Sequence, residues 1–151
     1  MVSAMDDLAN SPDLFFDVKA DLLPFLVDRG FAISLELYEP DVFGNCVIKL
    51  QSNDFLIVVT RDRTQVLMDI GLPSKPDSLF ALGVLIAFTE GSQDVQPLLT
   101  LEDEIPLLLR YADRLLNKSL LTDRAGEIVK FRREWSDRRW ERLRKDTGEQ
   151  P

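Results

Sequence analysis

The sequence predicts an α+β fold with an N-terminal helix, a four-stranded antiparallel meander, and then three helices packed on the sheet. Three observations support this fold class. The spacing of apolar residues changes after Gly30 from a helical period of about 3.6 to an alternation of about 2. The connections between the alternating segments are too short for the crossovers that parallel strands need. After Gly71 the helical spacing returns.

The first predicted helix begins at Pro12 and ends at Arg29. Ser11 suits its N-cap, and Pro12 suits the first helical position, where a missing N–H costs little. Pro24 should kink this helix, because proline cannot donate the hydrogen bond that the preceding turn requires. Gly30 is a suitable C-cap residue.

The first predicted strand alternates apolar and polar residues, which is typical of a half-buried strand. Its expected buried side chains are Phe31, Ile33, Leu35 and Leu37. The other three predicted strands are Asn45–Gln51, Phe55–Thr60 and Gln65–Ile70. Connections as short as Ser52–Asp54 and Arg61–Arg63 allow only antiparallel neighbours, and the strands therefore form a meander.

The segment Leu79–Phe88 is apolar on nearly every side, which indicates a buried helix, with Asp77 or Ser78 as its cap. Gly83 within it costs about 1 kcal/mol relative to alanine, so we expect close packing at that position.

The next predicted helix runs from about Asp103 to Leu116, with Pro106 tolerated in its first turn. Its apolar stripe consists of Ile105, Leu108, Leu109, Ala112, Leu115 and Leu116. Acidic residues are favourable at a helix N-terminus, so we interpret Glu102–Glu104 as capping residues rather than as a metal or partner site.

A final predicted helix is capped by Thr122 or Asp123 and runs to about Lys145. Ile128, Phe131 and Trp135 lie on one face of it and can anchor it to the body of the protein. Trp140 falls on a different side, so we expect it to be exposed or to take part in an interface.

The chain of 151 residues fits one domain, 1–151, with its core at about 11–145. No apolar run approaches the roughly 18 residues of a membrane span, and the N-terminus does not resemble a signal peptide. Cys46 is the only cysteine, which excludes an intrachain disulfide and is typical of a reducing compartment. We therefore expect a cytoplasmic protein that does not contact membranes.

Histidine is absent, which removes the usual general base and the commonest metal ligand. Catalytic sites of the Ser-His-Asp and Cys-His kinds are excluded, and so are structural zinc sites. The scattered glycines form neither a P-loop nor a dinucleotide fingerprint. We expect no enzyme activity, metal or cofactor, although 26 acidic residues leave a carboxylate-dependent enzyme open as an alternative.

Charge is distributed unevenly. Residues 1–123 contain nine basic and twenty acidic residues, whereas 124–145 contains nine of the eighteen basic ones. Basic and aromatic residues together can grip nucleic acid, but interleaved acids and a net charge of −8 oppose that use. We expect a protein partner instead. The candidate contact residues are Arg138, Arg139, Trp140 and Arg142, followed by Arg61 and Arg63.

The stretch Arg61-Asp62-Arg63-Thr64-Gln65-Val66, with its ending Asp69-Ile70-Gly71, resembles small acidic immunity-type proteins of bacterial toxin systems. This resemblance implies a non-enzymatic inhibitor with one protein partner, a basic toxin that an acidic surface can steer and occupy. The alternatives are a nucleic-acid-associated regulator that uses the basic C-terminal helix, and a carboxylate-dependent enzyme. The sequence allows a monomer or a homodimer.

Overall fold

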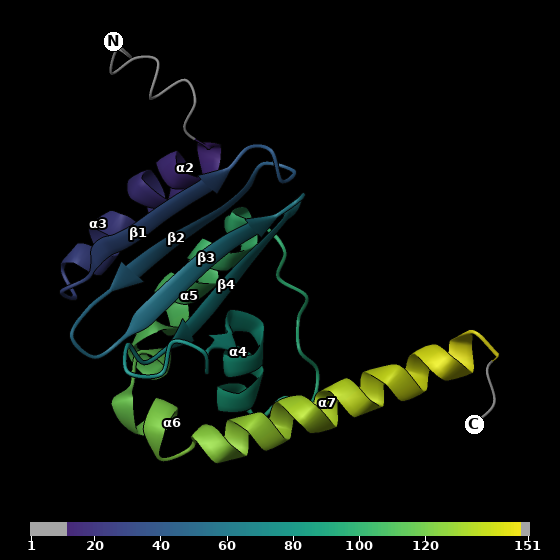
Figure 1. Cartoon of the computed structure of the whole chain (residues 1–151). Coiled ribbons are helices and arrows are strands. Elements are labelled where there is room, and N and C mark those ends of the chain that lie inside the picture. Colours follow the sequence, from purple (N-terminus) through teal and green to yellow (C-terminus); the bar gives the residue numbers. More distant parts are fainter. Residues whose placement is uncertain (1–11, 149–151) are drawn as a thin grey trace, which may run out of the picture.

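The computed structural model describes residues 12–148. Its five strands form one antiparallel sheet in the order β1-β2-β3-β4-β5 (Figure 1). The strands are β1 Ala32–Glu39, β2 Asn45–Gln51, β3 Leu56–Asp62, β4 Gln65–Gly71 and β5 Phe80–Ala81. The predicted α+β fold with its four-stranded meander is thus confirmed, and the sheet gains a fifth strand of two residues.

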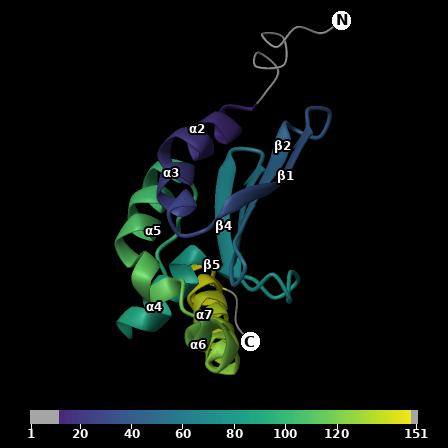
Figure 2. The same cartoon turned by 90° about the vertical axis from the view of Figure 1, so that its left-hand side faces the viewer.

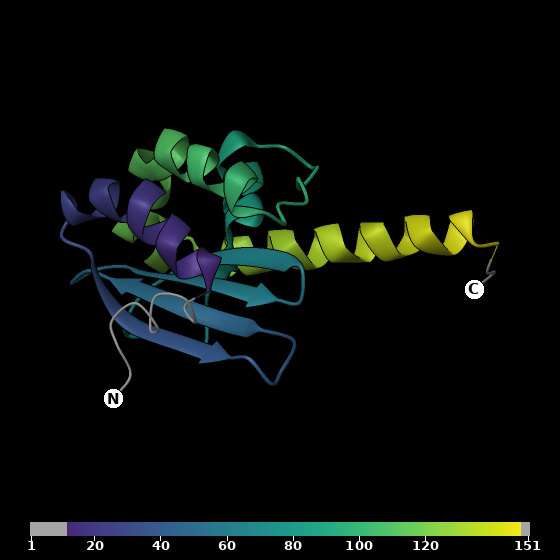
Figure 3. The same cartoon turned by 90° about the horizontal axis from the view of Figure 1, so that it is seen from above.

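Helices α2, α4 and α5 lie against one face of the sheet, which we call the inner face (Figures 2 and 3). The helices are α2 Asp13–Asp21, α3 Leu23–Val27, α4 Leu82–Glu90, α5 Leu101–Leu115, α6 Lys118–Thr122 and α7 Ala125–Asp146. Within residues 12–148 no helix covers the opposite face, which we call the outer face. Helix α7 passes the end of the sheet near β5 and projects beyond the rest of the fold (Figure 1).

The predicted N-terminal helix is divided into two. Helix α2 ends at Asp21, and α3 begins at Leu23 with Pro24 in its first turn, so the predicted kink is a break between helices. Pro12 is the N-cap residue with an extended backbone, not the first helical residue as predicted, and Ser11 lies outside the described residues. Gly30 follows α3 with a positive φ of 84°, a conformation that suits glycine.

The prediction for the face of β1 was wrong beyond Ile33. A bulge lies between Ile33, which pairs with Leu50, and Leu35, which pairs with Lys49. The extra residue, Ser34, reverses the alternation, because side chains in a strand change face at every residue. Phe31 and Ile33 still contact the core, whereas Leu35 and Leu37 point to the outer face.

The core lies between the inner face and the helices. Ile48, Leu50, Ile57 and Ile70 contribute from the sheet, with Leu85 from α4 and Leu108 from α5, and all six are fully buried. Each such side chain contributes about 1.5–3 kcal/mol through its removal from water.

The helices after the sheet start at positions that differ from the prediction. Residues 80 and 81 extend the sheet, so α4 begins at Leu82 with Ala81 as its N-cap, and neither Asp77 nor Ser78 caps it. A Cβ on Gly83 would lie 2.8 Å from the Gln96 carbonyl oxygen, which confirms the close packing predicted there.

Helix α5 begins at Leu101, where the Thr100 side chain accepts a hydrogen bond from the Asp103 main chain. The short helix α6, capped by Asn117, was not predicted, so four helices follow the meander instead of three. Helix α7 begins at Ala125, close to the predicted start. Its N-cap residue is Arg124, and neither Thr122 nor Asp123 caps it.

Candidate partner surface and an adjoining cavity

The outer face of the sheet has an apolar centre. Two neighbouring rows of side chains cross this face from β1 to β4. One row consists of Leu35, Lys49, Val58 and Asp69, and the other consists of Leu37, Val47, Thr60 and Leu67. Leu35, Leu37 and Leu67 remain 40%, 44% and 39% exposed. We call Leu35, Leu37, Val47, Val58 and Leu67 the apolar strip.

An apolar strip on this face is unexpected for a sheet whose other face already packs on helices. Antiparallel sheets with one solvated face usually alternate apolar residues inward with polar residues outward. Here both faces are apolar in the middle strands, and contiguous exposed apolar surface in a soluble domain usually marks an interaction site. The strip is therefore the strongest candidate for a partner contact.

Acidic side chains flank the strip. Glu39 ends β1 and Asp62 ends β3 at the same end of the sheet, both are exposed, and neither forms an ion pair within residues 12–148. Asp69 lies in the same row as Leu35, on the opposite side of Lys49 and Val58. Basic side chains lie among these acids, since Lys49 stands between Leu35 and Val58 and Arg63 follows Asp62, so the strip is surrounded by charges of both signs.

Arg61 and Arg63, predicted as contact residues, lie at the hairpin end next to Glu39 and Asp62. Arg61 is half-buried and donates from Nη2 to the Gly44 carbonyl oxygen at 3.0 Å. The Arg63 guanidinium lies 4.8 Å from the centroid of the exposed Phe43 ring. Arg61 thus fixes the β1–β2 loop, while Arg63 and Phe43 are exposed in the loops at this end of the sheet.

The other predicted contact residues lie in the second half of α7, which projects beyond the sheet (Figure 1). Arg138 donates to the Gln93 carbonyl oxygen at 3.3 Å, and Arg142 forms a 3.9 Å ion pair with Asp94. These contacts attach α7 to the loop after α4. Trp140 is 59% exposed, as expected from its helical position.

The first half of α7 docks on the body as its apolar face predicts. Ile128 is fully buried, and the Phe131 ring meets the Phe88 ring edge to face at a centroid distance of 5.8 Å. Arg132 reaches the Leu79 carbonyl oxygen at 3.5 Å, beside β5. The first half of the basic helix therefore packs against the rest of the protein.

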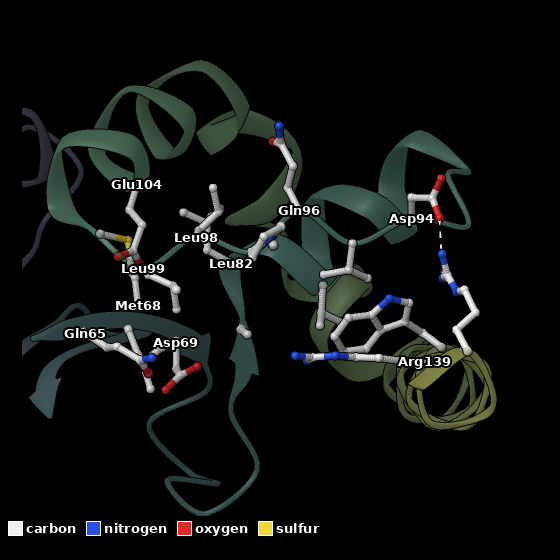
Figure 4. Close-up of a pocket in the computed structure, with 18 of the residues that line it drawn as sticks. Gln65, Met68, Asp69, Leu82, Asp94, Gln96, Leu98, Leu99, Glu104 and Arg139 are labelled. Atoms are coloured by element: carbon white, nitrogen blue, oxygen red, sulfur yellow. Dashed lines mark ion pairs between the residues drawn. The ribbon is translucent and has the colours of Figure 1, made fainter. Parts of the chain in front are cut away.

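A cavity of about 690 Å³ lies between the edge of β4, the 94–99 segment and α7 (Figure 4). Asp69 and the buried Glu104 lie at its β4 side, and Arg139 reaches into it from α7, with its guanidinium 5.6 Å from the Trp135 ring. Leucines from β4, α4, the 94–99 segment and α7 line much of the rest. Asp69 belongs to the outer-face row of Leu35, whereas Glu104 is buried on the inner side of β4, so the two carboxyl groups do not converge on one point as a carboxylate-dependent site requires.

Glu104 lies in the first turn of α5, as predicted for an acid at a helix N-terminus, but its side chain is buried instead of capping the helix. Glu102 and Asp103 are exposed, but Glu104 is 1% exposed and faces β4. A clue was present in the sequence, since Glu104 falls on the same helical stripe as the buried Ile105, Leu108 and Leu101. Amphipathic spacing alone thus places this carboxyl group against the core.

The surroundings of Glu104 favour its neutral form. Burial raises its pKa to about 8, a hydrogen bond with the Met68 main chain lowers it, and the charges of Asp69 and Asp103 raise it. Its Oε1 atom has no hydrogen-bond partner. Burial also raises the pKa of Asp69, an effect that the Arg132 charge partly offsets.

No group of three potential metal-ligating side chains occurs in the described part of the chain. No helix between residues 12 and 148 is long and apolar enough to cross a membrane. Cys46 is buried, and burial raises the pKa of its thiol. In the comparisons with known proteins, no family model, curated protein or solved structure matches this chain.

Proposed function

We propose that this protein is a non-enzymatic binding module and that its outer sheet face takes one protein partner. The observation that supports this most is the apolar strip, which leaves Leu35, Leu37 and Leu67 each about two-fifths exposed on a face that no helix between residues 12 and 148 covers. Burying these side chains under a partner would contribute favourable free energy at about 25 cal/mol per Å² of apolar surface. The exposed Phe43 and Arg63 lie in the loops at one end of the same sheet, and aromatic and arginine residues are enriched at binding hot spots.

Within this class we propose an immunity-type inhibitor of a basic toxin. The net charge of −8 favours a basic partner, and the exposed Glu39 and Asp62 are available to pair with its cations. Nuclease toxins are basic because they bind polyanions, so an acidic inhibitor can associate with them quickly and cover their active sites. Arg138 and Arg142 are engaged with the loop after α4, which makes a nucleic-acid site on α7 the weaker alternative.

The experiment is affinity capture of the tagged full-length protein from nuclease-treated lysate of its native cells, with three baits. The baits are the natural chain, Leu37→Asp on the apolar strip, and Phe16→Asp on α2. Phe16 is 70% exposed on the helix side of the molecule, so the control adds the same charge at an exposed apolar residue away from the strip. Circular dichroism verifies that both variants are folded.

We expect one stoichiometric protein with the natural chain and with Phe16→Asp, and its loss with Leu37→Asp. Expression of that protein alone should be toxic, and co-expression with the natural chain should restore growth. Equal capture by both variants would contradict the outer-face site. Recovery of nucleic acid from untreated lysate, with no protein, would overturn the proposal in favour of the regulator on α7.

A further inference from the structure

The cavity beside β4 has charged groups of both signs. Arg139 and Asp69 line it, and neither forms an ion pair within 4.0 Å among residues 12–148, although the charge of Arg132 acts on Asp69 from a greater distance. Arg142 also lines it, but Asp94 already compensates that charge at 3.9 Å. Charges that line a concave and partly apolar space gain more from a matched ligand than charges on an open surface do.

The two charges approach the cavity from different elements. Asp69 belongs to β4. Glu104 of α5 also lines the cavity, but its carboxyl group is buried, and its Oε1 atom has no hydrogen-bond partner. Arg139 extends from α7 toward that side of the cavity (Figure 4). Its guanidinium lies against Trp135, which limits the conformations it can adopt.

Between the charged groups the lining is apolar, with Leu82 from α4, Leu98 from the 94–99 segment and Leu143 from α7. The volume of about 690 Å³ lies within the roughly 300–1,000 Å³ of small-molecule sites. Gly83 allows the 94–99 segment to approach α4 closely, since a Cβ there would meet the Gln96 carbonyl oxygen. The apolar wall is thus built by a specific packing contact.

The geometry points to a binding site for a small apolar zwitterion, such as a dipeptide with aliphatic side chains. Its ammonium group, with three donors, would pair with Asp69, and its carboxylate would pair with the fork of Arg139. Its side chains would lie against the leucine wall. A ligand with only an anionic group would leave Asp69 without a donor, and one with only a cationic group would leave Arg139 unpaired.

This inference does not rest on the proposed partner, because it concerns a small molecule and the cavity groups alone. The test is a fluorescence titration of the full-length chain with L-leucyl-L-leucine. Trp135 lines the cavity and Trp140 is the only other tryptophan, so Trp140→Phe leaves a single reporter inside the site. N-acetyl-Leu-Leu, which lacks the ammonium group, and Leu-Leu-amide, which lacks the carboxylate, probe the two ends separately.

Asp69→Asn and Arg139→Gln are made in the Trp140→Phe background, with Arg144→Gln as the control on the exposed side of α7. We expect saturable binding of Leu-Leu that is weakened about tenfold or more by either ligand change or either cavity variant, and unchanged by Arg144→Gln. The Asp69→Asn variant should bind N-acetyl-Leu-Leu as tightly as it binds Leu-Leu. The Arg139→Gln variant should likewise bind Leu-Leu-amide as tightly as Leu-Leu. The absence of binding by the Trp140→Phe chain, or equal binding of all three ligands, would overturn the inference.

Discussion

Glu104 stands among exposed acids in the sequence but is itself buried between α5 and β4. Its neutral carboxyl group meets the Met68 main chain at the edge of β4, where β5 is too short to pair. The neighbouring Val66 N–H is satisfied in a comparable way, by the Leu99 carbonyl oxygen at 2.8 Å. The 99–104 segment therefore takes the place of a longer fifth strand, which protects an otherwise open sheet edge.

Replacing Glu104 by glutamine tests the protonation state of this group. Below about pH 4.5 the carboxyl group is protonated in both the folded and the unfolded chain. As pH rises from there to about 8, only the unfolded chain loses the proton, so the free energy of unfolding decreases. Glu104→Gln removes this loss, and we expect it to be more stable than the natural chain by about 1–3 kcal/mol at pH 8.

Denaturant unfolding at pH 5 and pH 8 measures the effect. The advantage of Glu104→Gln should be larger at pH 8 than at pH 5. Glu102→Gln, at an exposed acid in the same helical turn, keeps Glu104, so its difference in stability from the natural chain should be similar at both pH values. An advantage of the same size at both pH values would contradict a raised pKa at Glu104.

Gly83 allows a contact that no other residue permits. Alanine in place of glycine normally stabilises a helix by about 1 kcal/mol, but here its Cβ would lie 2.8 Å from a main-chain oxygen. We expect Gly83→Ala to lower the free energy of unfolding by about 1–3 kcal/mol. Gly126→Ala is the matched control in α7, where nothing lies within 4 Å, and it should stabilise the chain. Thermal unfolding of both variants decides this point.

At the scale of elements, strand β1 shows where prediction from the sequence ended. The alternation of Phe31, Ile33, Leu35 and Leu37 correctly predicts a strand, because the period of 2 depends only on local geometry. The bulge at Ser34 depends on pairing with β2, which a local pattern does not record. The exposed positions of Leu35 and Leu37, and with them the apolar strip, could therefore not be predicted.

The candidate site residues also divide into those whose positions follow from the local sequence and those whose contacts depend on the tertiary structure. The exposure of Trp140 follows from its helical angle and was predicted. The contacts of Arg138 with Gln93 and of Arg142 with Asp94 join segments that are far apart in the sequence, so no local pattern predicts them. For the same reason the cavity of Asp69 and Arg139 became visible only in three dimensions.

Helix α7 should be stabilising in its first half and nearly dispensable for stability in its second. Ile128 is fully buried, so Ile128→Ala should cost about 2–5 kcal/mol. Ending the chain after Asp137 removes the exposed contacts of Arg138 and Arg142, the contact of Arg139 with Trp135 and the half-exposed Leu143, which together should cost about 1 kcal/mol. Urea unfolding of the two proteins tests this difference. A truncated chain as unstable as Ile128→Ala would contradict it.

At the scale of the whole molecule, the fold separates two apolar surfaces by one sheet. The inner face meets the helices, and the outer face, with its apolar strip and acidic neighbours, is free within residues 12–148. Glu36, which falls on the inner face of the edge strand β1, pairs with Lys19 at 2.6 Å. An inward-pointing charge of this kind discourages another strand from adding to the edge, which favours contact across the face instead.

If the partner is basic, its association should depend on salt. The association rate constant should fall by about tenfold or more when ionic strength rises from 20 mM to about 500 mM, because steering by acidic side chains is screened. Glu39→Gln together with Asp62→Asn should reduce that dependence. Stopped-flow association kinetics with the captured partner provide the measurement. A rate constant that does not change with salt would contradict the basic-partner part of the proposal.

The most direct test of the outer-face site is a labelling footprint with the captured partner. Cys46 is buried and the pKa of its thiol is raised, so Leu37→Cys and Phe16→Cys each introduce one readily reactive thiol. We predict that the partner slows maleimide labelling of Leu37→Cys about tenfold or more and leaves the labelling rate of Phe16→Cys unchanged. Unchanged labelling of Leu37→Cys in the saturated complex would contradict a partner site on the outer face.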